Sequence, residues 1–112
     1  MTKKEIKQIL NNPRGHLIAV DLDLTLTKGK EYWGDKTQYI EPNQKMIDYV
    51  NNLYIKGGHI IIYTARMPSM YPETLGWLLS HNVLFHGIAM RIKPGSDCYI
   101  DDKAINLEDI VV

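Results

Sequence analysis

Hydrophobic residues along the chain fall into short unbroken runs that alternate with segments of helical spacing. Residues 17–20 and 59–63 form the two clearest runs, and turn-forming residues bound them, as is typical of strands buried on both faces of a parallel sheet. Shorter runs at 83–85 and 98–100 predict a third and a fourth strand. Apolar residues recur at helical spacing in three further segments, which are predicted to be helices: 3–11, 43–56 and 73–81.

The alternation of strands with helices predicts an α/β domain built on a parallel sheet. A length of 112 residues is about that of one hydrophobic core, so residues 1–112 are expected to form a single domain. Residues 26–40 contain two glycines and show no stable period, so they are predicted to form a loop or a small flap.

The composition is that of a protein with no overall basic excess and no membrane helix, and it does not identify a binding partner. Basic and acidic residues number 13 each, so the chain lacks the overall basic excess of many nucleic-acid-binding proteins, although a local basic patch stays open. The longest uncharged apolar runs are far shorter than the roughly 20 residues of a membrane helix. The N-terminal segment lacks the apolar centre of a secretory signal, and the single Cys98, predicted to be a core residue, fits a reducing compartment, so a cytoplasmic location is expected.

Polar side chains follow the predicted strands directly. In open parallel sheets, ligands bind beyond the carboxyl ends of the strands, so these side chains are expected to converge on one edge of the sheet. They are Asp21, Asp23, Thr64, Arg66, Asp101 and Asp102. Taken singly, an acid after a strand is usually a turn former or a cap, and Thr64 is usually a capping hydroxyl. The whole set, in this order, favours a shared chemical function.

That function would be phosphoryl transfer. The Asp21 carboxylate, held at the end of a rigid strand, can act as a nucleophile and form an acyl phosphate. Asp23 is placed to donate a proton to a leaving group and then to take one from water. Thr64 offers a hydroxyl to a phosphoryl oxygen, and Lys93 can balance the charge of Asp21, although a lysine alone is more often a solvated surface charge.

The acids at these strand ends also suit a metal ion. A nucleophilic carboxylate approaching a phosphate dianion needs its charge neutralised, and Mg²⁺ with oxygen ligands does this. Asp101 and Asp102 follow the last predicted strand and can supply the distant carboxylate of such a site.

At these residues the chain resembles the haloacid dehalogenase superfamily of phosphohydrolases. The segment VDLDLT at 20–25 matches the nucleophile signature of that superfamily, and IYT at 62–64 matches the second motif. Lys93 matches the third motif, and IDD at 100–102 matches the acidic fourth. The resemblance covers roughly residues 17–110.

The resemblance implies a role for each matched residue. Asp21 would be the nucleophile and Asp23 the general acid and base, while Thr64 and Lys93 would bind phosphate and nucleophile. Mg²⁺ would be held by the Asp21 carboxylate, the Asp23 main-chain carbonyl and an acid of the fourth motif. Asp102 is favoured for that ligand, with Asp101 beside it. Thr25 would support the geometry of the substrate-binding loop.

One departure from the superfamily pattern concerns its cap domain. Only about 17 residues separate Thr25 from Pro42, and 28 lie between Thr64 and Lys93, so neither gap has room for a cap. The resemblance therefore implies a capless, three-layer, Rossmann-like domain with a small parallel sheet flanked by helices. Capless members resemble enzymes that act on large substrates or use a partner subunit as a lid, which leaves a homo-oligomer open.

The substrate is less defined than the chemistry. Aromatic and lysine side chains of the flap can stack on a sugar or a base and meet further phosphates, or Trp33 can instead pin the flap to the body of the domain. These flap residues are Lys28, Lys30, Tyr32, Trp33, Lys36 and Tyr39. Arg66 resembles the Ser/Thr-x-Arg of polynucleotide-kinase-type phosphatases and is predicted either to bind phosphate or to form a structural ion pair.

The sequence thus predicts a Mg²⁺-dependent phosphomonoester hydrolase that forms an aspartyl phosphate. The closing segment YIDDKAIN, at 99–106, resembles proteins of bacterial surface-sugar synthesis, which favours a sugar phosphate or a nucleotide as substrate. The alternatives are a polynucleotide 3′-phosphatase and a non-catalytic binding module that needs a partner. A signalling receiver domain is disfavoured, because its paired acids end the first strand, whereas here D-x-D comes first and D-D last.

Overall fold

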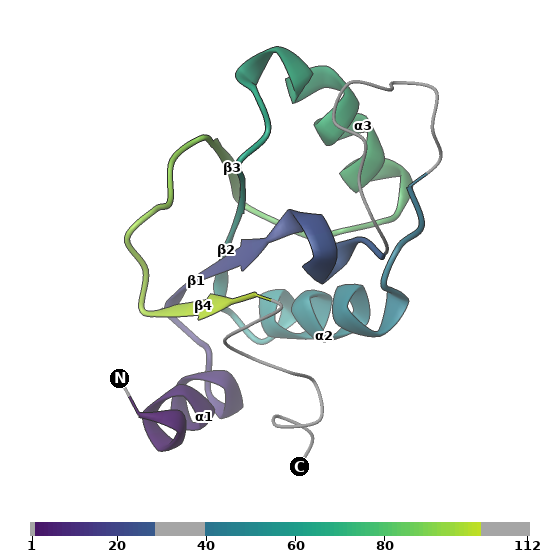
Figure 1. Cartoon of the computed structure of the whole chain (residues 1–112). Helices are drawn as coiled ribbons and strands as arrows, with labels where there is room; N and C mark the ends of the chain where they lie inside the picture. The colour runs from purple at the N-terminus through teal and green to yellow at the C-terminus, as the bar shows by residue number, and fades with distance from the viewer. Residues whose placement is uncertain (1, 29–39, 102–112) are drawn as a thin grey trace.

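The computed structural model describes residues 2–28 and 40–101 of the chain. Its helices and strands alternate along the sequence as predicted (Figure 1). In chain order the elements are α1 (Lys3–Asn11), β1 (Leu17–Asp21), α2 (Gln44–Ile55), β2 (His59–Thr64), α3 (Tyr71–Ser80), β3 (Gly87–Met90) and β4 (Cys98–Ile100). Two single turns complete the list, a π-type turn at Leu22–Leu26 and a 3₁₀ turn at Pro68–Met70.

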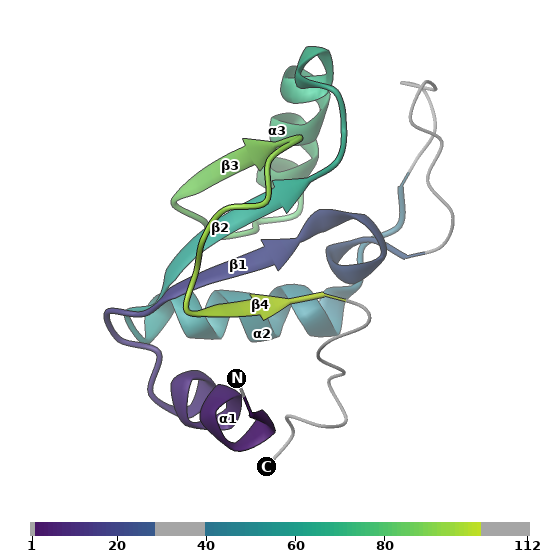
Figure 2. The same ribbon diagram turned by 60° about the vertical axis from the view of Figure 1, so that its left-hand side comes forward.

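The four strands form one parallel sheet in the order β3-β2-β1-β4 (Figure 2). β1 is central, with Asp21 opposite Tyr63 of β2 and Val20 opposite Ile100 of β4. All four carboxyl ends therefore lie at the same edge of the sheet. The predicted fold class, an α/β Rossmann-like domain with a parallel sheet flanked by helices, is confirmed.

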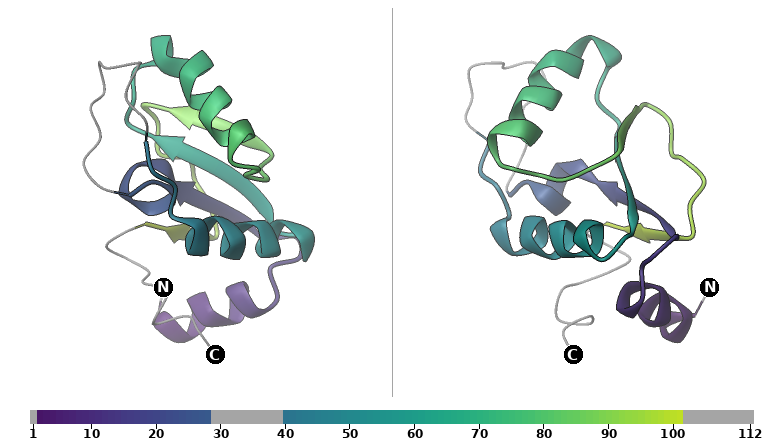
Figure 3. Two further views of the ribbon diagram at one scale, coloured as in Figure 1. Left: turned by 90° about the vertical axis from the view of Figure 1, so that its right-hand side faces the viewer. Right: turned by 180° about the vertical axis from the view of Figure 1, so that it is seen from behind.

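The hydrophobic core lies between the sheet and the pair of helices α2 and α3, which cover the same face (Figure 3, left). Alternate residues of each strand point into it, because successive side chains of a strand face opposite ways. The fully buried members include Ile18, Val20, Ile60, Ile62 and Ile100 from the strands, together with Ile47, Val50 and Leu78 from the helices. Cys98 is buried there too, as predicted.

The opposite face of the sheet is crossed by the connection from β3 to β4, residues 91–97 (Figure 2). The strand residues that alternate with the core positions belong to this face. They include Ala19 and, opposite it in register, Tyr99 of β4. α1 lies beside the β4 edge, at the far side of the molecule from α3 (Figures 1 and 3).

The third strand was predicted at the wrong place. Residues 83–85 are apolar because Val83 packs into the core directly after α3, where its N–H donates to the carbonyl of Leu78. The N–H of Leu84 donates to the Asn51 side chain of α2, so this segment pairs with helices instead of strands. Pairing with β2 begins at His86, whose N–H donates to the Ile60 carbonyl, and the strand follows at Gly87–Met90.

α1 and β4 have the predicted bounds, and apart from β3 those of the other elements differ by one or two residues. β1 and β2 each run one residue further, and so include Asp21 and Thr64. α3 begins at Tyr71, so Pro72 lies in its first turn, where proline is tolerated, and not in the preceding loop. The bases of the predicted flap lie together, since Lys28 N–H donates to the Glu41 carbonyl at 2.8 Å. Residues 29–39 of the flap lie outside the described part.

Within residues 2–28 and 40–101, no helix has the length and apolar character needed to cross a membrane.

Candidate active site

The chain turns sharply after β1, and the turn is held by its own residues. Leu24 has the left-handed φ of +66°, which is costly for a residue with a side chain. The N–H of Leu24 donates to the Thr27 hydroxyl at 3.0 Å, and the N–H of Thr27 donates to the Leu22 carbonyl at 3.2 Å. These two bonds stabilise the unusual conformation. They present Asp21 and Asp23 at the carboxyl edge of the sheet.

Asp23 is fixed from the neighbouring strand. The Thr64 hydroxyl donates to Asp23 Oδ2 at 2.8 Å. Arg66 donates to the other oxygen, Oδ1, from Nη2 at 2.8 Å and from Nε at 3.0 Å. Three residues that were predicted to converge on one edge are therefore in direct contact, although 41 positions separate Asp23 from Thr64 in the sequence. Convergence of this part of the predicted set is confirmed.

Arg66 forms a buried ion pair with Asp23. The arginine is 3% exposed, and its remaining nitrogen, Nη1, donates to the Thr74 hydroxyl of α3 at 3.3 Å. The main-chain N–H of Arg66 donates to the Thr64 hydroxyl at 3.1 Å. Of the two roles predicted for Arg66, the ion pair is present, and phosphate binding stays a prediction. The guanidinium orients the Asp23 carboxylate.

The Thr64 hydroxyl donates to Asp23 in this structure. Its predicted contact with a phosphoryl oxygen stays a prediction. A hydroxyl has one proton to donate, so it can serve a phosphate only by releasing the carboxylate.

The loop after β1 is also tied to the start of α2. Asn43 caps α2 by accepting from the N–H of Met46, and its side-chain amide donates to the Thr25 carbonyl at 3.2 Å. Its own N–H donates to the Leu26 carbonyl at 2.7 Å. Thr25 is buried, and its hydroxyl oxygen has no hydrogen-bond partner among the described residues. The Thr25 main-chain carbonyl links the loop to α2, and the predicted role of Thr25 in substrate binding stays a prediction.

Three residues of this frame were missed by the sequence analysis: Thr27, Asn43 and Thr74. Asn43 had a signal, because an asparagine before an apolar helical pattern is a common N-cap. Thr27 and Thr74 had none, because a threonine in a loop or a helix carries no mark of the distant group that it will contact.

Two further predicted site residues, Asp101 and Lys93, come from the segments next to β4, and β4 lies on the opposite side of β1 from β2. Asp101 follows β4 directly, one register position beyond the Val20 and Ile100 pair, so it lies at the strand end next to Asp21. Lys93 lies in the β3–β4 connection, with its Nζ 4.5 Å from the centre of the Tyr99 ring. Asp102 and Trp33, to which the sequence assigned metal and substrate binding, lie outside the described residues.

The described members of the predicted ligand set, Asp21, Asp23 and Asp101, carry oxygen donors and lie at or just after neighbouring strand ends, which suits Mg²⁺. Within the described parts of the chain, no three acidic, histidine or cysteine side chains gather as a metal site. The predicted set does not require that, because it combines the Asp21 carboxylate with the Asp23 main-chain carbonyl and with Asp102. The oxygen donors of these residues fit a hard divalent cation.

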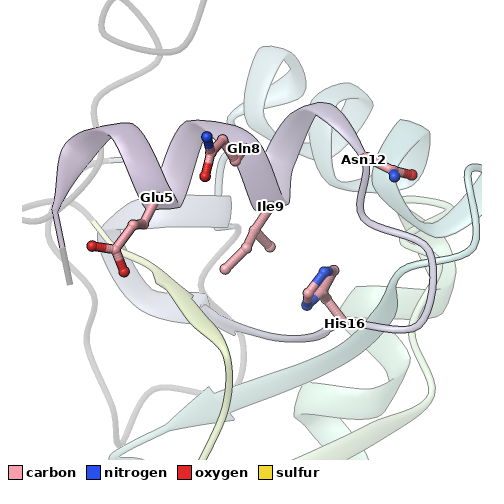
Figure 4. Close-up of a pocket in the computed structure, with 5 residues that line it drawn as sticks. All are labelled: Glu5, Gln8, Ile9, Asn12 and His16. Carbon is pink, nitrogen blue, oxygen red and sulfur yellow. The ribbon is translucent and has the colours of Figure 1, made fainter.

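A separate hollow of about 330 Å³ lies at the other end of the molecule (Figure 4). It is lined by Glu5, Gln8, Ile9 and Asn12 of the α1 region and by His16, which precedes β1. Because Asp21 ends β1, this hollow and the acid cluster lie at opposite ends of the same strand.

The fold and the strand-end acids define the class: an α/β Rossmann-like domain with a polar site at the carboxyl edge of its sheet. No protein-family model matches the chain, and no curated protein matches it. Among solved structures it is similar to a crystal structure of a Vibrio cholerae protein, with 27% identity and a TM-score of 0.60 over 85% of this chain and 93% of that one.

The chain is also similar to part of a chain in the structure of a Pnkp1/Rnl/Hen1 complex. The TM-score is 0.61 at 17% identity, and the match covers 80% of this chain. It covers 30% of the other chain, so this protein spans less than a third of that neighbour. A likeness at this identity shows the shared fold.

Proposed function

We propose that the protein is a Mg²⁺-dependent phosphomonoester hydrolase that forms an aspartyl phosphate on Asp21. The observation that carries the proposal is the fixed position of Asp23, which Thr64 and Arg66 hold two residues beyond Asp21 at the carboxyl edge of the sheet. The similarity to a chain of the Pnkp1/Rnl/Hen1 complex supports a phosphatase-type fold. The resemblance of the motifs around Asp21, Thr64 and Lys93 supports the reaction.

The proposed reaction has two steps. A carboxylate oxygen of Asp21 attacks phosphorus, and the bond from phosphorus to the leaving oxygen breaks while Asp23 gives that oxygen a proton. Water then attacks the phosphorus of the aspartyl phosphate while Asp23 takes a proton from the water. The bond from phosphorus to the Asp21 oxygen breaks, which regenerates the Asp21 carboxylate and releases inorganic phosphate. Asp23 therefore changes protonation in each step, and the contacts from Thr64 and Arg66 keep its oxygens in place through the cycle.

The cation would be held by the Asp21 carboxylate, the Asp23 main-chain carbonyl and Asp102, with Asp101 beside it. When bound, Mg²⁺ neutralises part of the charge that the phosphate and the nucleophile bring together. Lys93 would balance the remaining negative charge near Asp21.

The proposed substrate is a small phosphomonoester, a sugar phosphate or a nucleotide. The alternative with a specific observation behind it is a polynucleotide 3′-phosphatase, because Thr64 and Arg66 have the Ser/Thr-x-Arg spacing of that class and the fold is shared with a chain of the Pnkp1/Rnl/Hen1 complex. In this chain Arg66 contacts Asp23, so it would serve such a substrate indirectly. A non-catalytic binding module is the remaining alternative.

The deciding experiment is phosphate release from sugar phosphates, nucleotides and 3′-phosphorylated oligonucleotides, with Mg²⁺ and with EDTA. We expect release that needs Mg²⁺ and is abolished in Asp21→Asn, which keeps the side-chain shape but removes the nucleophilic charge. The matched control is Asp48→Asn, an exposed acid on α2. Release that persists in Asp21→Asn would contradict the assigned nucleophile. No release from any substrate would favour the binding module.

A further inference from the structure

Lys93 lies on neither a helix nor a strand, so any fixed position of its side chain has to come from contacts with other residues. It belongs to the seven-residue connection between β3 and β4, residues 91–97, and its side chain is exposed. An exposed lysine side chain in a coil samples many conformations, and its rotamer freedom opposes any fixed position. A group that balances charge in a transition state has to be held close to its productive place.

The connection is anchored before Lys93, where the N–H of Arg91 donates to the Thr64 carbonyl of β2 at 2.8 Å, and again after Lys93. Tyr99 of β4 donates its hydroxyl hydrogen to the Pro94 carbonyl at 2.6 Å. Asp97 and Leu17 exchange two bonds of 2.8 Å, from Asp97 N–H to the Leu17 carbonyl and from Leu17 N–H to Asp97 Oδ2. Pro94 further restricts the backbone of the residue before it, which is Lys93, to extended conformations. The main chain of Lys93 therefore has a defined course over the sheet.

Two aromatic rings receive the Lys93 side chain. Its Nζ lies 4.5 Å from the centre of the Tyr99 ring and 6.0 Å from the centre of the Tyr63 ring. The two rings stand edge to face, with centres 6.2 Å apart and planes at 90°. An ammonium within about 6 Å of a ring centre is attracted by the negative face of that ring, most strongly at the shorter distance.

The register places this arrangement on the same face of the sheet as the Asp21 position. Tyr63 is opposite Asp21, and Tyr99 is opposite Ala19, so the rings flank β1 from β2 and β4. Ala19 and Asp21 alternate with the core positions Ile18 and Val20 and so belong to the face that the β3–β4 connection crosses.

We propose that Tyr99, assisted by Tyr63, is a positioning residue that holds the Lys93 ammonium on the Asp21 side of β1. The ring face of Tyr99 holds the ammonium and its hydroxyl holds the Pro94 carbonyl, so one side chain fixes both the head group and the main chain of the lysine segment. The kinetic part of this inference rests on the proposed phosphatase function, whereas the structural part can be tested without turnover.

The first test is the NMR signal of the Lys93 ε-methylene group, assigned by its absence in Lys93→Arg. The Tyr99 ring should shift this signal upfield of the other lysines in the wild-type protein. Tyr99→Phe keeps the ring face and should keep the shift, whereas Tyr99→Leu should lose it. The matched control is Tyr54→Leu, since Tyr54 stacks on His86, away from Lys93, at 4.5 Å between ring centres.

The second test is the rate of phosphate release in the same variants. Tyr99→Leu should lower kcat about two- to fivefold, the factor that corresponds to an exposed cation–π contact, while Tyr54→Leu leaves it unchanged. Tyr99→Phe should fall between wild type and Tyr99→Leu. If Tyr99→Leu loses the ring-current shift but keeps kcat, Tyr99 has no positioning role.

A wild-type Lys93 ε-methylene signal at the chemical shift of the other lysines would show that the Tyr99 ring does not hold the Lys93 ammonium, whatever the kinetics show. If instead the wild-type protein shows the shift but releases no phosphate, the proposed function and the kinetic role of Tyr99 fail together. The contact between Tyr99 and Lys93 then stands as a structural feature alone. Because Tyr99→Phe retains the ring, it still tests the ring face if Tyr99→Leu does not fold.

Discussion

At the scale of single residues, Arg66 links the stability of the domain to its site. Its guanidinium is buried and contacts Asp23 of the β1 turn and Thr74 of α3. Removing one partner of a buried ion pair leaves the other charge without compensation, which costs far more than losing an exposed pair. The Asp23 side chain is only 13% exposed, so water cannot replace the lost donors well.

We therefore expect Arg66→Gln to lower the free energy of unfolding by about 3–5 kcal/mol. The exposed Arg91 provides the matched control, and Arg91→Gln should change the free energy of unfolding by less than about 0.5 kcal/mol. Urea unfolding of both variants measures the difference. Equal, small losses in the two variants would show that the Arg66 and Asp23 pair contributes little to folding.

At the scale of elements, Asn43, the residue directly before α2, connects that helix to the loop that follows β1. The Asn43 oxygen accepts from Met46 N–H within the helix, and its amide nitrogen donates to the Thr25 carbonyl. The same side chain thus caps α2 and holds the turn that presents Asp21 and Asp23. Two substitutions separate these contributions, because aspartate retains the capping oxygen and lacks the amide donor.

Asn43→Ala should lower the free energy of unfolding by about 1 kcal/mol, the usual cost of a lost N-cap, and should also slow turnover. Asn43→Asp should keep most of the stability, since a carboxylate both caps the helix and interacts favourably with its N-terminus, but should still slow turnover because the Thr25 carbonyl loses its donor. Thermal unfolding and phosphate release measure the two effects. Full turnover in Asn43→Asp would show that the Thr25 contact is dispensable.

At the scale of the whole molecule, three groups with shifted pKa values in the described part of the chain bear on how stability depends on pH. Burial, assisted by the neighbouring Asp97 carboxylate, raises the pKa of the Cys98 thiol to about 11. Burial likewise raises the pKa of Tyr49 to about 12. His86 is exposed, but desolvation of its ring, together with the neighbouring His59, lowers its pKa, and its Nδ1 accepts from the Ile60 N–H and so carries no proton. The folded state therefore holds all three groups neutral.

We expect stability to fall on both sides of neutral pH. Below His86's ordinary pKa of 6.5 the unfolded chain binds a proton more readily than the folded one, so stability decreases as the pH falls. Above Cys98's ordinary pKa of 9.0 the unfolded chain releases a proton more readily, so stability decreases as the pH rises. Urea unfolding across this range should show less alkaline loss in Cys98→Ala and less acid loss in His86→Gln. Unchanged slopes in either variant would assign that loss to other groups.

Much of the element pattern was already determined by local sequence. The apolar runs that became β1, β2 and β4 are buried on the core side, and the helices at Lys3–Asn11, Gln44–Ile55 and Tyr71–Ser80 follow their apolar spacing closely. β3 was misplaced because an apolar residue can be buried without pairing in a strand. Val83 packs into the core directly after α3, whereas the true strand, Gly87–Met90, is half-exposed and has a weak hydrophobic pattern.

For the site, the sequence by itself determined which residues end the strands, because buried apolar runs stop where charged side chains begin, and parallel strands bring those ends to one edge. It could not determine their partners. The contact of Asp23 with Arg66, that of Arg66 with Thr74, and the position of Lys93 over Tyr99 were decided only by the tertiary structure. The reason is physical: these contacts depend on the strand order β3-β2-β1-β4 and on how α3 packs, and neither is encoded in the local pattern around any one residue.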